Sequence, residues 1–236
     1  IRGGLGHVNI LTSLFFSEIA GTATSDAAAI GSVMIPQMRK RGYPAAFAAA
    51  VTSTSATMAI IVPPSLNLIL YAYVANASIA ELFAAGILPG IMVCALLMAT
   101  AYIISVKRGY PTEGEFSLKR VAETGKDAAI PLTLPILILV GILGGIFTAT
   151  EAGAIAAFWS IVLAGLVYRT VKMGTLIDTL RVAGKRSAML MFIVATSTLL
   201  GWYLTNQRIP QDSAQAILGI SDNYWVVLLT INVFFL

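Results

Sequence analysis

The sequence predicts an all-α membrane protein: a helical bundle with a re-entrant helical hairpin and a transmembrane helix broken by two prolines. Of the 236 residues, 58% are hydrophobic and 11% are charged, and the mean hydropathy is +0.86. An average soluble domain has about 25% charged residues. Apolar runs at 82–106, 128–150 and 187–205 are close to or above the roughly 20 residues that cross a hydrocarbon core as a helix. Two other apolar segments are interrupted by polar residues or prolines.

Lysine and arginine residues set the expected topology. They cluster at 39–41, 107–126 and 169–186, and together with Arg2 these clusters hold 14 of the 15 basic residues, which leaves Arg208 on the other side. Basic clusters beside membrane spans are typical of cytoplasmic connections. Each interval between clusters should therefore contain an even number of crossings. Because the positive charge forms no continuous stripe, the net charge of +4 does not indicate a nucleic-acid partner.

The first interruption lies in the hairpin at residues 5–38. Residues 5–20 and 26–38 number 16 and 13, too few for two full crossings at about 1.5 Å per residue. The chain is therefore expected to enter the membrane and return, with its tip at the sequence GTATS. Gly21 can turn the backbone, and Ser25 or Asp26 can accept from the free N–H groups of the second half-helix. Alternatively, the small residues are only a packing seam.

The second interruption is the sequence AIIVPPSLN inside the span at 44–74. Pro63 and Pro64 lack backbone donors, so the carbonyls of Ala59 and Ile60 lose their helical partners. Unpaired carbonyls are costly in hydrocarbon, and the break should face protein, water or an ion. Ser65 is expected near the N-terminus of a new half-helix with free N–H groups. The alternative is a simple proline kink.

The remaining elements follow from the apolar runs and the basic clusters. We expect an outer loop at 75–81, a return span at 82–106, spans at 128–148, 151–168 and 187–204, an outer connection at 205–224 and a last span from 225. Leucine and valine residues at helical spacing predict amphipathic surface helices at 117–126 and 174–186. We expect these two segments either to act as braces at the membrane surface or to be ordinary connecting helices.

Other polar residues have weaker predictions. Glu151 follows Thr150, which is expected to cap the next helix. Glu18 could carry a proton, stabilise a cation or pair locally, and His7 is expected to be structural. Cys94 is the single cysteine, which excludes a disulfide framework within the chain. An intramembrane enzyme using Asp26, Glu18 and Ser65 is an alternative that no catalytic motif supports.

Five motifs in order resemble the large membrane subunit of tripartite ATP-independent periplasmic (TRAP) transporters. They are GGLGHVNILTSLFFSEIAGTATSDAAAIGSVMIPQMRKRGYPAAFAAAV, IIVPPS, SIAELFAAGILPG, GGIFTATEAGAIA and LGWYLTNQRIPQ, and they extend over nearly the whole chain. Together they are specific, where each alone would be weak.

The resemblance implies a secondary transporter of the bacterial inner membrane, usually sodium-driven, with an inverted-repeat fold and an elevator motion. Its implied partners are a small membrane subunit, a periplasmic substrate-binding protein, the lipid bilayer and a small organic anion such as a C4-dicarboxylate, keto acid, sugar acid or sialic acid. No cofactor is implied besides Na⁺ as coupling ion. A stand-alone cation-coupled anion symporter of related fold is the main alternative.

The resemblance also implies domains and an incomplete chain. Residues 1–75 are expected in the moving transport domain, residues 76–127 form a scaffold span and amphipathic helix, and residues 128–236 begin the second repeat. The chain lacks an initiator Met and ends in an apolar run, so we expect a fragment. The second hairpin, the second ion site and half of the substrate site would lie beyond Leu236.

The implied sodium site joins the hairpin tip to the broken helix, mainly through backbone carbonyls. Its residues in this sequence are Ala20, Gly21, Ala59, Val62 and Pro64. The side chains expected to bind substrate are Thr22, Thr24, Ser65 and Asn67. Ala20 stands where the family commonly has Ser, Ala59 where it has Gly, and Ala149 where it has Pro. The lost hydroxyl at Ala20 would leave a carbonyl ligand intact.

Overall fold

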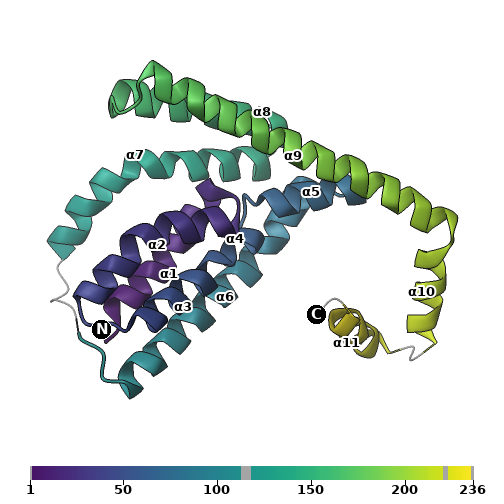
Figure 1. Ribbon diagram of the computed structural model, residues 1–236, viewed down its shortest axis with the longest axis horizontal. Helices are drawn as coiled ribbons and strands as arrows, with labels where there is room; N and C mark the ends of the chain where they lie inside the picture. Colours follow the sequence, from purple (N-terminus) through teal and green to yellow (C-terminus); the bar gives the residue numbers. More distant parts are fainter. Residues whose placement is uncertain (1, 113–117, 220–222, 235–236) are drawn as a thin grey trace. The chain divides into compact units, whose positions relative to one another are not determined.

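The computed structural model describes residues 2–112, 118–219 and 223–234, and the regular elements in these ranges are helices (Figure 1). Arg2 and Thr112 form one isolated antiparallel bridge. The all-α prediction is therefore confirmed for this part of the chain. The chain divides into two compact units, Ile1–Thr170 and Val171–Leu236, which are described separately.

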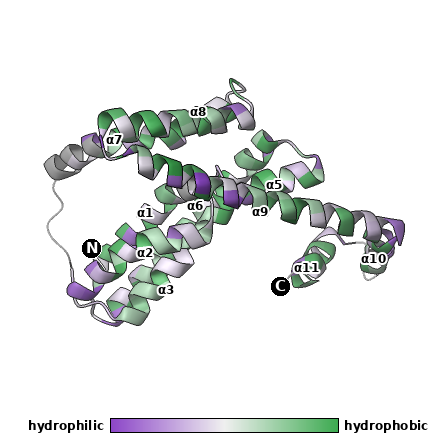
Figure 2. Cartoon of the chain, turned by 45° about the horizontal axis from the view of Figure 1, so that its top comes forward, coloured by the Kyte–Doolittle hydropathy of each residue, from purple (hydrophilic) through white to green (hydrophobic). Residues whose placement is uncertain are grey.

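Within the described ranges, four helical segments are long and apolar enough to cross a membrane. They are Ala45–Ala75, Ile79–Lys107, Ala149–Val167 and Met173–Asn206. Figure 2 shows hydrophobic residues along most of the length of these helices. Large apolar side chains such as Leu88, Ile91 and Leu96 are exposed, as expected for spans that contact lipid.

The predicted hairpin consists of α1 (Gly4–Ala20) and α2 (Ala23–Lys40). Gly21 ends α1 in the left-handed region with φ 63°, and its N–H donates to the carbonyl of Ser17 at 3.0 Å. The expected cap at Ser25 or Asp26 was wrong. Thr22 is extended, and its hydroxyl accepts from the N–H of Ser25 at 3.3 Å. The second helix therefore begins earlier than predicted, at Ala23.

The broken helix is also present, as α3 (Ala45–Ala56), α4 (Met58–Ile61) and α5 (Leu66–Ala75). Residues 62–65 separate α4 from α5 and include a cis peptide bond between Pro63 and Pro64. The N–H of Val62 makes the last helical bond before the prolines, to the carbonyl of Met58 at 2.8 Å. Missing donors in the prolines explain why the helix stops here.

Helix α6 (Ile79–Lys107) approaches the break through two glycines. A β carbon at Gly86 would lie 2.6 Å from the carbonyl oxygen of Ile61, and one at Gly90 would lie 2.7 Å from Cγ2 of Val62. Real β carbons essentially never come this close. The absent side chains therefore allow α6 to pack directly on the interrupted backbone.

The main core joins α1, α2, α3 and α6, and three aromatic rings close one end of it. The ring centroids of Tyr43 and Tyr110 are 5.3 Å apart, and those of Phe47 and Tyr110 are 4.8 Å apart. Ile10, Met38, Val51 and Cys94 belong to the same buried cluster. Aromatic pairs at such distances add stabilisation beyond the area that they bury.

The next two helices pack against each other, with α7 (Leu118–Leu143) leading into α8 (Ala149–Val162) and the short π-helix η1 (Leu163–Val167). The cap expected at Thr150 was wrong, because Thr148 takes this role. Its hydroxyl accepts from the N–H of Glu151 at 3.3 Å, and Glu151 accepts in return from the N–H of Thr148 at 2.8 Å. This capping box confirms a structural role for Glu151.

A separate amphipathic helix at 117–126 is not found in the described residues. From Leu118 onward the segment is part of α7, because Gly125 alone is too weak a breaker to end a helix. The side chains of residues 118–123 lie outside the described part of the chain, so the face that they would form is not described.

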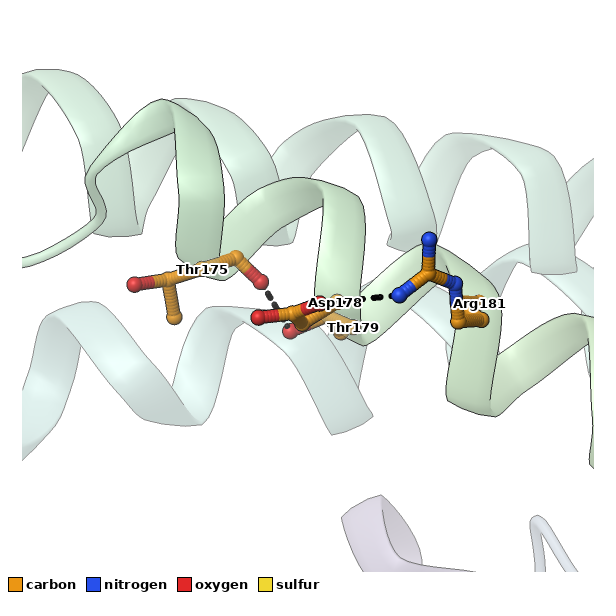
Figure 3. Close-up of polar contacts among 4 residues, drawn as sticks. All are labelled: Thr175, Asp178, Thr179 and Arg181. Atoms are coloured by element: carbon orange, nitrogen blue, oxygen red, sulfur yellow. Dashed lines mark hydrogen bonds and ion pairs between the residues drawn. The ribbon is translucent and has the colours of Figure 1, made fainter.

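The second unit contains α9 (Met173–Asn206), α10 (Ile209–Leu218) and α11 (Tyr224–Phe234). The expected surface helix at 174–186 and the span at 187–204 are one continuous helix. Figure 3 shows polar contacts near the start of α9: Arg181 pairs with Asp178 at 3.6 Å, and the hydroxyl of Thr179 donates to the carbonyl of Thr175 at 2.8 Å. Both charged groups are exposed, so the pair stabilises the helix little. Helix α10 was not predicted.

Replacing Gly86 by Ala should destabilise the packing of α6 on the break. The new methyl group would overlap the carbonyl of Ile61, and overpacking of this kind typically costs about 1–3 kcal/mol. We expect a lower midpoint of thermal unfolding for the protein in detergent. Gly153→Ala on α8 is the matched control, since no atom lies near its β carbon. Equal unfolding midpoints for the two variants would contradict the packing argument.

Candidate functional site

The hairpin tip lies against the broken helix. A β carbon at Gly21 would lie 3.9 Å from Cβ of Leu66, the first residue of α5. Helices α1 and α2 both contact α4 on the other side of the break. The fold thus brings together the two interruptions that the sequence identified separately.

The carbonyls at the break are only partly unpaired. Pro63 cannot donate to the carbonyl of Ala59, as predicted. For Ile60 the prediction was wrong, because the hydroxyl of Ser65 donates to its carbonyl at 2.8 Å. A serine five residues downstream thus replaces the N–H that Pro64 lacks, which removes the cost of burying that carbonyl without a partner.

The five residues of the predicted sodium site lie on these two segments. Ala20 ends α1, and its side chain is outside the described part of the structure. Gly21 and Pro64 are partly buried, whereas Ala59 and Val62 are buried. Unwound backbone of this kind can supply carbonyl oxygens to a cation. The assignment of Na⁺ to these residues stays a prediction.

The four predicted substrate-binding residues differ in exposure. Thr24 and Asn67 are exposed and Thr22 is partly buried. The hydroxyls of Thr22 and Thr24 lie 3.5 Å apart at the tip. Ser65 is fully buried and precedes α5. The N-termini of α2 and α5 bring free N–H groups and positive dipole ends to this region, which favours an anion.

A row of buried polar side chains in α1, α2 and α3, here called the seam, was not predicted. Nδ2 of Asn9 donates to the hydroxyl of Thr52 at 2.7 Å, and the hydroxyls of Ser13 and Ser55 lie 3.0 Å apart. Asp26, expected at the tip as a cap, is fully buried. The spacing of Asn9 and Ser13, four residues apart in an apolar helix, was the signal that could have found the seam.

An apolar cavity of about 200 Å³ adjoins the break. It is lined by Leu14, Val62, Pro63, Ile87, Ile91 and Leu139. These side chains carry no polar group that would orient an anion, so the cavity does not fit the substrate expected at the tip.

Comparison with known proteins gives the family. A sequence profile of the family described as "Tripartite ATP-independent periplasmic transporter, DctM component" matches residues 1–236. The sialic acid TRAP transporter large permease protein SiaM of Vibrio cholerae serotype O1 is 39% identical over 236 residues, which cover 100% of this chain and 55% of that protein. The C4-dicarboxylate TRAP transporter large permease protein DctM of Pseudomonas aeruginosa is 35% identical over 233 residues, covering 99% of this chain and 55% of that protein.

A third relative is named for a different cargo. The ectoine/5-hydroxyectoine TRAP transporter large permease protein UehC of Ruegeria pomeroyi is 35% identical over 222 residues, which cover 94% of this chain and 52% of that protein. The chain spans about half the length of the curated relatives it matches. These relatives are transport permeases, which confirms the non-enzymatic prediction.

The helices and the family agree on the cellular location. Four candidate spans occur in the described ranges, and the protein resides in the bacterial inner membrane, as predicted. Because the family profile matches all 236 residues, the chain belongs to the DctM family, the large permeases of tripartite ATP-independent periplasmic transporters.

Proposed function

We propose that this chain is part of the large permease of a sodium-coupled secondary transporter that imports a small organic anion. The observation that carries the proposal is the approach of the hairpin tip to the broken helix, 3.9 Å between a β carbon at Gly21 and Cβ of Leu66. Two stretches of interrupted backbone therefore lie at one place. Irregular backbone at membrane depth is tolerated where it is buried in protein or lines a cavity.

The cation would bind through peptide oxygens. Carbonyls of Ala20 and Gly21 at the tip and of Ala59, Val62 and Pro64 at the break are the proposed ligands. Hard cations prefer oxygen ligands, and unwound helices of secondary transporters supply them near the middle of the membrane. Burial of Ala59 and Val62 supports a dehydrated ion at this place.

The anion would bind beside the cation. We assign to it the side chains of Thr22, Thr24, Ser65 and Asn67 and the free N–H groups that open α2 and α5. Since the hydroxyl group of Ser65 already donates its hydrogen to the carbonyl of Ile60, Ser65 would contribute its backbone N–H to the anion. Relatives are named for sialic acid, C4-dicarboxylate and ectoine transport. All three carry a carboxylate, which supports a small organic acid as the cargo here.

The family suggests how part of the permease moves and how the anion reaches it. The hairpin and the broken helix would move together across the membrane as part of an elevator. A small membrane subunit would complete the permease, and a periplasmic binding protein would deliver the anion. The word "tripartite" in the family description supports these two partners over a stand-alone symporter.

Removing Na⁺ should strongly reduce uptake. The full-length permease containing this chain, with its small subunit, is reconstituted into liposomes with its binding protein and tested with labelled sialic acid, succinate and ectoine. Coupling free energies typically correspond to roughly 5- to 150-fold changes, so we expect uptake of one cargo to fall by about tenfold when choline replaces Na⁺ at constant membrane potential. Unchanged uptake would contradict sodium coupling, and uptake without the binding protein would favour the stand-alone symporter.

Replacing both Pro63 and Pro64 by Ala should abolish sodium-dependent uptake. The two restored N–H groups would allow the helix to continue and would occupy the carbonyls of Ala59 and Ile60. Sodium binding at this site, measured by isothermal titration calorimetry on the purified complex, should be lost with it. Pro89→Ala is the matched control, because Pro89 lies exposed within the continuous helix α6. Full activity of the double variant would refute the proposed site.

A further inference from the structure

We infer that the buried seam in α1, α2 and α3 contains an additional cation site, centred on the carboxylate of Asp26 and distinct from the second ion site expected beyond Leu236. Its ligand is a small monovalent cation that neutralises this carboxylate, either Na⁺ or a proton. The site uses side chains and lies outside the residues assigned to the carbonyl site above. It does not depend on that assignment.

Asp26 is fully buried on α2, and neither of its carboxylate oxygens has a hydrogen-bond partner among the described residues. A buried carboxylate without a partner is strongly disfavoured, because it loses its hydration and gains nothing in return. The group therefore requires a positive partner that reaches it inside the hairpin.

A pair of buried hydroxyl groups leads from this carboxylate to a third helix. The Ser13 hydroxyl of α1 lies beside Asp26 and is 3.0 Å from the Ser55 hydroxyl of α3. Ser55 is also 3.1 Å from the carbonyl of Thr52, so its single hydrogen has two possible acceptors. Both serines are fully buried. Hydroxyl oxygens can either coordinate Na⁺ or exchange a hydrogen bond with a protonated carboxyl group.

One helical turn before Ser13 on α1, Asn9 also has an acceptor oxygen to which no described donor is paired. Nδ2 of Asn9 donates to Thr52 at 2.7 Å and lies 3.6 Å from the sulfur of Met38, whereas its Oδ1 is buried and has no partner within the part of the chain that the structure describes. The unpaired atoms of Asn9 and Asp26 are therefore all acceptors. His7, also on α1, lies against Tyr102 of α6 and so belongs to another side of the helix.

No charged side chain described around Asp26 offers compensation. Helices α3 and α4, which contact α2, contain no titratable residue. Helix α1 carries His7 and Glu18, and the Glu18 side chain lies outside the described part. Arg39 and Lys40 are exposed at the opposite end of α2, on the order of 20 Å away along the helix. A free cation is therefore the partner that would neutralise the carboxylate of Asp26.

The test uses the full-length permease complex in nanodiscs and Asp26→Asn, which keeps the shape and removes the charge. Asp178→Asn on α9 is the matched control, because Asp178 is exposed. Thermal unfolding is followed while NaCl replaces choline chloride and, separately, from mildly acidic to mildly alkaline pH. Heat stability at each condition is the readout, and no transported substrate is required.

Two results support the site and identify its cation. If Na⁺ binds, Asp26→Asn loses part of the sodium-dependent stabilisation that Asp178→Asn and the Pro63/Pro64 double variant retain. If a proton binds, the wild type loses stability as the pH rises, because its native state holds a proton that the unfolded chain releases. Asp26→Asn then has a flat profile over this range.

A second pair of variants keeps the test decisive if Asp26→Asn does not fold. Ser55→Ala removes the hydroxyl that contacts Ser13 and keeps the charge of Asp26, so sodium should bind several-fold more weakly or the pH profile should shift. Ser32→Ala is its control, since the exposed Ser32 hydroxyl only donates to the carbonyl of Ala29. Sodium and pH responses equal to wild type in both Asp26→Asn and Ser55→Ala, or in Ser55→Ala alone if Asp26→Asn does not fold, would overturn the proposal.

Discussion

The structure of the first unit depends on satisfying peptide groups that lack helical partners inside a membrane protein. Pro63 and Pro64 remove two donors, and each carbonyl left without a partner in hydrocarbon would cost several kcal/mol. The fold supplies a replacement donor at Ser65 and encloses the remaining backbone. Glycines 86 and 90 let α6 approach the break closely, and the hairpin tip approaches it at Leu66. The packing of α6 and of the hairpin tip against the break thus follows from one interruption.

Much of this architecture could be predicted because its causes are local. Adjacent prolines end a helix whatever surrounds them, and Gly21 favours a turn with positive φ. The hairpin and the broken helix were therefore recognised from short stretches. The capping residues were harder to predict, because Thr22 and Thr148 each have neighbouring residues with hydroxyl groups that can also cap a helix. Which residue becomes the cap depends on the backbone conformation that the preceding chain imposes.

The tertiary part of the candidate site could not be predicted. Nothing in the sequence pairs Ser65 with Ile60, and nothing near the tip shows that Asp26 turns inward between α1 and α3 instead of capping α2. Both outcomes are set by packing of segments far apart in the chain. Continuity of α7 and α9 was missed for another reason: a change from amphipathic to apolar character does not end a helix unless a breaker accompanies it.

The short separation between tip and break has a practical consequence. A disulfide joins β carbons about 3.8 Å apart, close to the 3.9 Å between a β carbon at Gly21 and Cβ of Leu66. Cysteines at these two positions would lie at disulfide distance across the proposed ion-binding region, and the positive φ at position 21 would strain the substituted residue. Cys94, the single native thiol of this stretch, is buried in the core and would compete little for oxidant. The chain thus lends itself to redox trapping of the joined tip and break.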